Sequence, residues 1–219
     1  MPLYRYFNDI NYARDFADGK FRLSAASHYR QEKSDRGDSS EGAPLLFTKE
    51  DCSLTPRSLD LLSQFPLPQL LSSVGTLQMK SGQWFELVPI DHYALCFSKN
   101  PLLSKFGQHR ARLDEGDLIT FGQRVADSIR NQTIVRAPGF DFEVGFIYKD
   151  IRYEVTNFQK GIEVIRGELP DDFNSLYFEK IFTKPSEYSD EEEIRLAFFY
   201  TSKDMQVLLS ALKNTNERR

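Results

Sequence analysis

The sequence of 219 residues predicts an α+β fold in which two small, mostly antiparallel sheets pack around a cleft, with helices on the flank. Segments with the two-residue period of a strand lie near the start, in the middle and near the end of the chain. Segments with the helical period lie between them. The eighteen Phe and ten Tyr residues suit an interior built from aromatic side chains and sheets.

The first expected elements are a strand, a helix and a second strand. Leu3–Phe7 alternates and carries Arg5. A helix over Ile10–Asp18 is expected to end at Gly19, which favours a left-handed backbone, and Phe21–Ser24 is expected to be a strand. The helical spacing predicts a buried stripe of Ile10, Ala13, Phe16 and Ala17.

The middle of the chain is expected to mix both kinds of element. Pro56 starts a helix that Thr55 caps. Strands are expected over Trp84–Val88, His92–Ser98 and Asp117–Phe121. A helix is expected over Gln123–Arg130, followed by a hairpin of Glu143–Lys149 and Ile151–Thr156. The near-continuous apolar run of His92–Ser98 favours a central place in a sheet.

Near its end the chain reads SDEEEIRLAFFY over Ser189–Tyr200. Four acids lead into a strand in which Ile194, Leu196 and Phe198 face one way and Arg195, Ala197 and Phe199 the other. If this period extends back, Glu191 and Glu193 share a face with Arg195, whose charge favours their ionised forms. A docking helix is expected over 202–213, where Met205, Leu208, Leu209 and Leu212 form an apolar stripe.

Composition excludes several classes of protein. No apolar run is long enough to cross a membrane, and the N-terminus lacks a signal-peptide pattern, so we expect a cytoplasmic protein. With a net charge of −4, the protein as a whole has no positive field that would attract nucleic acid. The two Cys and three widely spaced His residues predict no metal site, and nucleotide-binding and hydrolase motifs are missing. The sequence shows no domain linker, so we expect one domain over 1–219.

Two groups of polar residues are candidate sites. A polar loop over 27–44 holds Asp35, Asp38 and Glu41, which could bind Mg²⁺ with phosphate as in a nuclease. The other group comprises Arg5, Ser24 or Ser27, and the pair Glu191 and Glu193, on three strand-like segments. The acids before Ile194 can also be a solvated strand end. As a site residue at the mouth of a cleft, Glu193 is expected to be partly hydrated.

The second group resembles the Arg–Ser–Glu triad of the ADP-ribosyltransferase superfamily. Nearly the whole chain also resembles a bacterial family of unknown function, through Tyr4-Arg5, Gly19–Ser24 with Glu41-Gly42, Cys96-Phe97-Ser98, Lys184-Pro185, and Glu191-x-Glu193-x-Arg195. Toxins of the superfamily usually carry Ser-Thr-Ser, whereas this chain has Ser24-Ala-Ala-Ser27. The identity of the middle Ser therefore stays open.

The resemblance implies an ADP-ribosyltransferase-like fold and assigns roles to eight residues. NAD is the implied substrate, with Glu193 and Glu191 catalytic and Arg5, Ser24, Ser27, Tyr29, Arg30 and Arg36 binding the dinucleotide. A carboxylate stabilises the positive ribose that forms as nicotinamide leaves. Among the other six residues, the arginines supply planar guanidinium groups for phosphate or ribose, the serines supply hydroxyls, and the tyrosine supplies a ring that stacks on nicotinamide.

We therefore expect an enzyme that transfers ADP-ribose to a macromolecule, with nucleic acid as one candidate acceptor, in a toxin or phage-defence setting that includes an antitoxin or defence partner. This setting is an analogy with the fold. The first alternative is a non-enzymatic sensing or interaction module of a defence system. The second is a metal-dependent nuclease that uses Asp35, Asp38 and Glu41.

Overall fold

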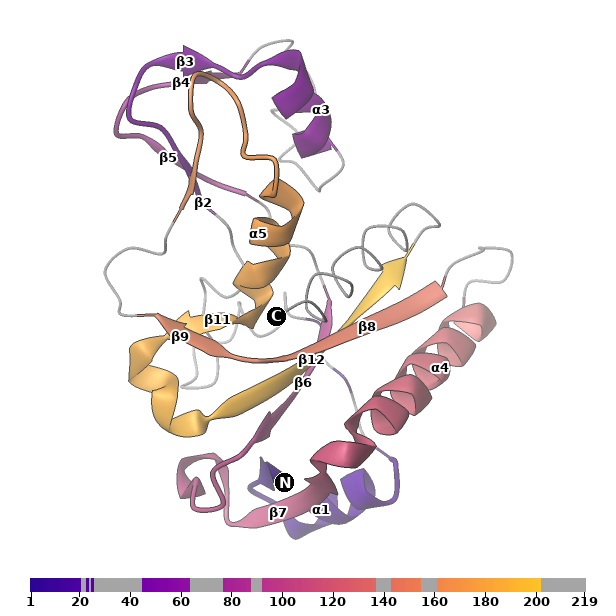
Figure 1. The fold of residues 1–219 in the computed structure, drawn as a ribbon. Coiled ribbons are helices and arrows are strands. Elements are labelled where there is room, and N and C mark those ends of the chain that lie inside the picture. Colours follow the sequence, from indigo (N-terminus) through magenta and orange to yellow (C-terminus); the bar gives the residue numbers. More distant parts are fainter. Residues whose placement is uncertain are drawn as a thin grey trace. The chain divides into compact units, whose positions relative to one another are not determined.

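The computed structural model describes residues 1–20, 23, 25, 45–63, 77–87, 92–136, 143–154 and 161–201. The chain divides into two compact units (Figure 1). Unit 1 consists of Met1–Gly37, Asp91–Ile151 and Glu187–Arg219, and unit 2 of Asp38–Ile90 and Arg152–Ser186. The sequence predicts one domain over 1–219, whereas the structure gathers Asp38–Ile90 and Arg152–Ser186 into a unit of their own.

Unit 1 is built on one antiparallel sheet of five strands in the order β7-β1-β6-β12-β8. The strands are β7 (His109–Asp114), β1 (Pro2–Phe7), β6 (Tyr93–Ser98), β12 (Glu193–Thr201) and β8 (Glu143–Asp150). The prediction that His92–Ser98 is a central strand is confirmed, since β6 pairs with both β1 and β12. With helices beside it, the sheet confirms the α+β class.

Two helices cover one face of this sheet, which we call the helix-packed face. They are α1 (Ile10–Ala17) and α4 (Leu118–Arg136), which runs alongside β8 in Figure 1. Phe16 of α1 and Val125 of α4 join a core cluster with Leu3, Phe97 and three residues of β12, namely Ile194, Leu196 and Phe198. Asp9 caps α1 by accepting from the Asn11 N–H at 2.8 Å, and Gly19 follows the helix with φ 75°. This helix was predicted correctly.

Two details of these helices differ from the predictions. Ile10 and Ala17 were expected to be buried, but both are exposed, because Ala13 and Phe16 alone turn toward the sheet. The strand expected over Asp117–Phe121 is wrong, since Leu118 already begins α4. The β-branched residues there favour a strand, but burial of Leu118 together with Val125, seven residues later, selects the helix.

The hairpin expected around Lys149–Asp150 is also wrong. β8 pairs over its whole length with β12, and the Ile151 N–H continues that pairing by donating to the Glu193 carbonyl oxygen at 2.8 Å. The next strand, β9 (Arg152–Glu154), belongs to unit 2, where it pairs in parallel with β11 (Thr183–Pro185). β8 and β9 are therefore adjacent in sequence but do not pair with each other.

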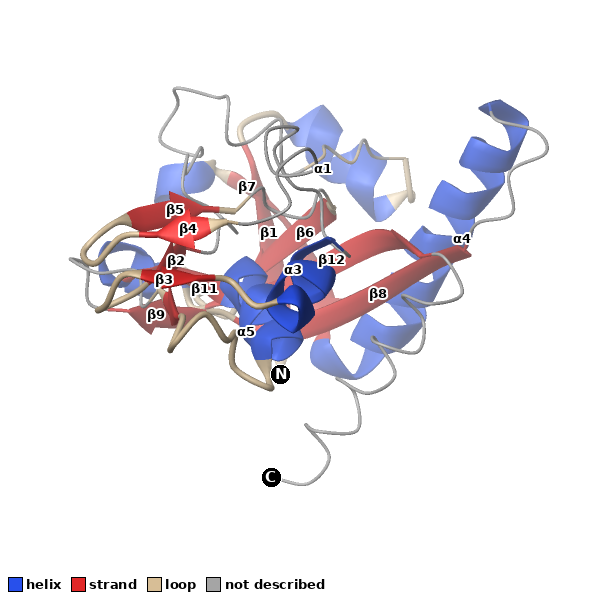
Figure 2. Cartoon of the chain, turned by 90° about the horizontal axis from the view of Figure 1, so that it is seen from above, coloured by secondary structure: helices blue, strands red, loops and turns tan. Residues whose placement is uncertain are grey.

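The described residues of unit 2 form three small sheets and two α-helices, and Figure 2 separates strands and helices by colour. One sheet has the order β10-β2-β5, from β10 (Ile162–Glu163), β2 (Leu45–Phe47) and β5 (Trp84–Glu86). A second pairs β3 (Cys52–Ser53) with β4 (Gln78–Met79), and the third is the β9–β11 pair. The helices are α3 (Pro56–Ser63) and α5 (Phe173–Glu179).

Local sequence explains two features of unit 2. Thr55 caps α3 as predicted, because its hydroxyl accepts from the Ser58 N–H. Arg166 and Gly167 both have positive φ, and Ile165 and Glu168 exchange two backbone hydrogen bonds across them. This pattern is a two-residue turn that suits glycine. A Cβ on Gly167 would overlap the Ser53 carbonyl oxygen.

Candidate functional site

The two faces of β12 are buried in different ways. Ile194, Leu196 and Phe198 enter the helix-packed core, as predicted. The opposite face, which we call the second face, carries Glu193 and Arg195, whose cross-strand partners on β6 are Ser98 and Cys96. Residues opposite each other across an antiparallel pair share a face, so these four side chains project from the same side of the sheet.

Glu193 and Arg195 form a buried ion pair. The Arg195 Nε donates to Glu193 Oε1 at 2.8 Å, and the exposed fractions of the two side chains are 5% and 1%. The shared face predicted for these two residues is therefore confirmed, but the strand period does not extend back to Glu191, which ends a 3₁₀ turn (Ser186–Glu191) before β12 begins. The expectation that Glu193 is partly hydrated is wrong, since its carboxylate is buried and paired with Arg195.

Glu191 is held by a second cation. Its side chain is 4% exposed, and its Oε1 lies 3.4 Å from the Nζ of Lys105, which also contacts Asp190 at 2.9 Å. Burial lowers the pKa of Lys105, but the hydrogen bond to Asp190 and the charge of Glu191 outweigh that effect and raise it. Lys105 is therefore a firmly charged ammonium group at neutral pH.

A backbone corner separates the two carboxylates. Glu192 adopts φ 43°, in the left-handed region that residues with a Cβ seldom occupy. Three hydrogen bonds hold this corner: Lys99 N–H to the Glu192 carbonyl oxygen at 3.0 Å, Glu192 N–H to that of Ser189 at 3.3 Å, and Ser98 Oγ to that of Glu191 at 2.6 Å. The end of β6 thus fixes the conformation that directs both Glu191 and Glu193 inward.

Arg5 does not join this cluster. Tyr4 is the cross-strand partner of Ser98, so Tyr4 lies on the second face and its neighbour Arg5 on the helix-packed face. The Arg5 guanidinium lies 5.5 Å from the centre of the Phe16 ring and donates to the Cys96 carbonyl oxygen at 3.1 Å. Arg5 therefore links β1, β6 and α1, and the sheet separates it from Glu193.

The remaining residues expected at the site lie outside the described part of the chain. They are Ser24, Ser27, Tyr29, Arg30 and Arg36. The same holds for the polar loop over 27–44 with its three acids, for most of the strand expected at Phe21–Ser24, and for the docking helix over 202–213.

Three side chains that the sequence analysis did not place at the site contact its backbone or its carboxylates. They are Ser98, Lys105 and Asn100, whose amide nitrogen donates to the Asp190 carbonyl oxygen at 2.9 Å. Ser98 appears in the quoted Cys96-Phe97-Ser98 motif, but no local signal marks it as facing Glu193. Lys105 lies in a short 3₁₀ turn, η1 (Ser104–Phe106), with nothing in its neighbours to indicate its distant partners.

No three His, Cys, Asp or Glu side chains of the described residues gather in a way that could hold a metal ion. None of the helices within the described ranges combines the length and apolarity needed to cross a membrane.

Comparison with known proteins gave no match to a protein-family model, a curated protein or a solved structure.

Proposed function

We propose that the chain is an NAD-dependent ADP-ribosyltransferase with an ADP-ribosyltransferase-like α+β fold, in which Glu193 and Glu191 are the catalytic carboxylates. The observation that supports it best is the burial of both groups at the start of a central strand, each beside a cation. Burying ionised groups is costly, and groups with such surroundings concentrate at functional sites. The proposal leaves Arg5 out of the site.

In the proposed reaction the bond between ribose C1′ and the nicotinamide nitrogen breaks, and its electron pair leaves with nicotinamide. The ribose becomes an oxocarbenium-like cation, which the Glu193 carboxylate stabilises while accepting a hydrogen bond from the 2′-hydroxyl. A nucleophile of the acceptor forms the new bond to C1′ and transfers its proton to Glu191.

The neighbouring cations have positioning roles in this scheme. Arg195 keeps Glu193 ionised and fixes its orientation, and Lys105 does the same for Glu191. Ser98 fixes the backbone between the two carboxylates. Because Glu193 is 5% exposed, a substrate reaches it only when the groups that cover it move.

The test is release of nicotinamide and transfer of label from NAD. Glu193→Gln should lower release by about 10²–10³-fold, the usual effect of losing one electrostatic contact with the transition state. Glu191→Gln should reduce transfer more than hydrolysis, because Glu191 acts on the acceptor. Asp150→Asn is the matched control, since Asp150 is 64% exposed and pairs with Lys99 near the same end of the sheet.

A second variant separates loss of chemistry from loss of folding. Replacing the pair with apolar residues, Glu193→Leu with Arg195→Met, removes both buried charges and is expected to keep the fold. This protein should melt normally and release no nicotinamide. A folded double variant with wild-type activity, or a wild type without nicotinamide release, would refute the proposal. The latter result would favour the non-enzymatic interaction module.

A further inference from the structure

A row of four polar residues crosses four neighbouring strands on the second face of unit 1. Arg112 of β7 pairs with Tyr4 of β1, Tyr4 pairs with Ser98 of β6, and Ser98 pairs with Glu193 of β12. Strands lie about 4.8 Å apart, so three such steps place the Arg112 backbone about 14 Å from that of Glu193. The row therefore connects the buried carboxylate to the edge of the sheet.

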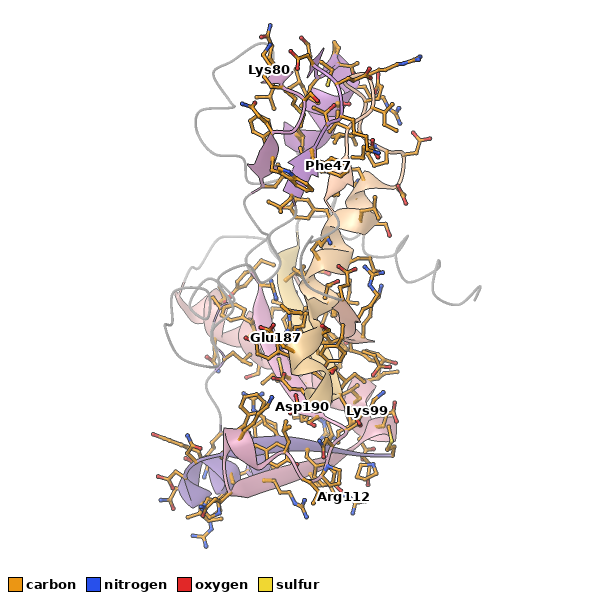
Figure 3. The ribbon with its side chains drawn as sticks, turned by 90° about the vertical axis from the view of Figure 1, so that its left-hand side faces the viewer. Phe47, Lys80, Lys99, Arg112, Glu187 and Asp190 are labelled. Atoms are coloured by element: carbon orange, nitrogen blue, oxygen red, sulfur yellow. The ribbon has the colours of Figure 1, made fainter. Side chains whose placement is uncertain are left out.

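The edge of the row is basic and exposed. Arg112, labelled in Figure 3, is 63% exposed, and Arg110 lies two residues before it on the same face. The Arg110 guanidinium lies 4.9 Å from the centre of the Tyr4 ring and donates to the Pro101 carbonyl oxygen at 2.6 Å. These two contacts hold its planar fork against the sheet.

The charges at this edge are available to a ligand. Within the described residues, Arg110 has no carboxylate partner. Arg112 contacts Asp114 at 2.8 Å, but both side chains are more than half exposed, and ion pairs of this kind contribute little. A phosphate group, which binds arginine in a bidentate manner, can replace Asp114 at little cost.

We infer that Arg110, Tyr4 and Arg112 form a phosphate-binding surface, and that its ligand is a single-stranded polynucleotide, the acceptor for the ADP-ribosyl group at Glu193. The second part rests on the proposed function. A ligand that contacts Arg112 and also reaches Glu193 has to extend over about 14 Å, farther than one phosphate group, which suits a strand of linked nucleotides. β7 is an edge strand, so a polymer can continue past Arg112.

The first experiment measures binding of a fluorescent single-stranded oligonucleotide at several salt concentrations and does not depend on catalysis. Arg110→Ala and Arg112→Ala should each weaken binding about tenfold at low salt and reduce the salt slope by about 0.7, the value for one phosphate contact on a single strand. Arg124→Ala is the matched control, since it removes the same charge from the exposed side of α4. It should leave the slope unchanged.

Two further variants test the details. Asp114→Asn should tighten binding, because it releases Arg112 and no capping hydrogen bond of the Asp114 side chain is lost. Tyr4→Phe should bind like the wild type, since the ring remains, whereas Tyr4→Leu should bind like Arg110→Ala. A thermal melt of each variant confirms its folding.

The outcomes separate this inference from the proposed function. Absence of oligonucleotide binding, or equal losses in Arg124→Ala, would overturn the surface whatever the result with NAD. If ATP competes with the oligonucleotide as well as an unlabelled oligonucleotide does at equal phosphate concentration, the ligand is a free nucleotide and the polymer assignment is wrong. If Arg112→Ala lowers label transfer from NAD to the oligonucleotide and leaves nicotinamide release unchanged, the result supports both the binding surface and the acceptor role. Binding without transfer would overturn the acceptor role alone.

Discussion

Glu193→Gln should destabilise unit 1 substantially. Arg195 is 1% exposed and Glu193 is 5% exposed, so the variant removes the negative charge that lies 2.8 Å from a buried guanidinium. Removing one partner of such a pair costs about 3–5 kcal/mol, and the amide oxygen of Gln retains one hydrogen bond, so about 3 kcal/mol is expected. For a chain of this size, 1 kcal/mol shifts the melting temperature by about 2–4 °C, which gives a decrease of about 6–12 °C.

The double variant and the exposed pair provide the comparison. Glu193→Leu with Arg195→Met removes both charges, and exchanges of this kind are neutral or stabilising by about 1–4 kcal/mol. Asp150→Asn breaks the exposed pair with Lys99 and should cost no more than about 1 kcal/mol. The large effect should therefore belong to the single variant at position 193 alone.

The assay follows unfolding with two probes. Far-UV circular dichroism reports both units, whereas fluorescence of Trp84, the single tryptophan of the chain, reports unit 2. Because Glu193 belongs to unit 1, the decrease for Glu193→Gln should appear in circular dichroism. If Glu193→Gln melts with the wild type, or if the double variant is as unstable as the single one, the assignment of a buried ion pair is wrong.

Three further predictions concern the corner, one turn and one pH dependence. Glu192→Gly should stabilise by up to about 1 kcal/mol in urea unfolding because it relieves the left-handed strain, and Glu192→Val should destabilise; the reverse order would contradict the strain. Gly167→Ala should lower the melting temperature more than Gly82→Ala, since both have positive φ but only Gly167 meets a neighbouring backbone, and equal decreases would exclude the overlap. The wild type should melt above Lys105→Gln up to pH 10.5, the ordinary pKa of lysine, and this difference should vanish as pH rises through the raised pKa; a difference that persists would exclude the charge as its source.

Local pattern alone determined several elements of this protein. The alternation in Ser189–Tyr200 predicted both faces of β12 and placed Glu193 beside Arg195. Gly19 predicted where α1 ends and Thr55 where α3 begins, because such residues act on the backbone next to them. The α+β class followed from these elements together.

The tertiary structure decided which strands pair and which polar residues meet. β8 pairs with β12, far along the chain, and not with the adjacent β9. Pairing in a sheet depends on burial across all of its strands, which adjacency in sequence does not determine. The contact between Lys105 and Glu191 likewise depends on tertiary structure, because nothing in the sequence around Lys105 indicates its partner.

The position of Arg5 shows the limit of the sequence most clearly. The two-residue period of a strand shows that Arg5 and Tyr4 lie on opposite faces, as Glu193 and Ile194 do. The sequence does not show whether Arg5 and Glu193 share a face. A shift of one residue in either the β1–β6 or the β6–β12 pairing would reverse the answer. The observed register, Tyr4 with Ser98 and Ser98 with Glu193, places Arg5 on the helix-packed face beside Phe16 and Tyr4 on the face of Glu193.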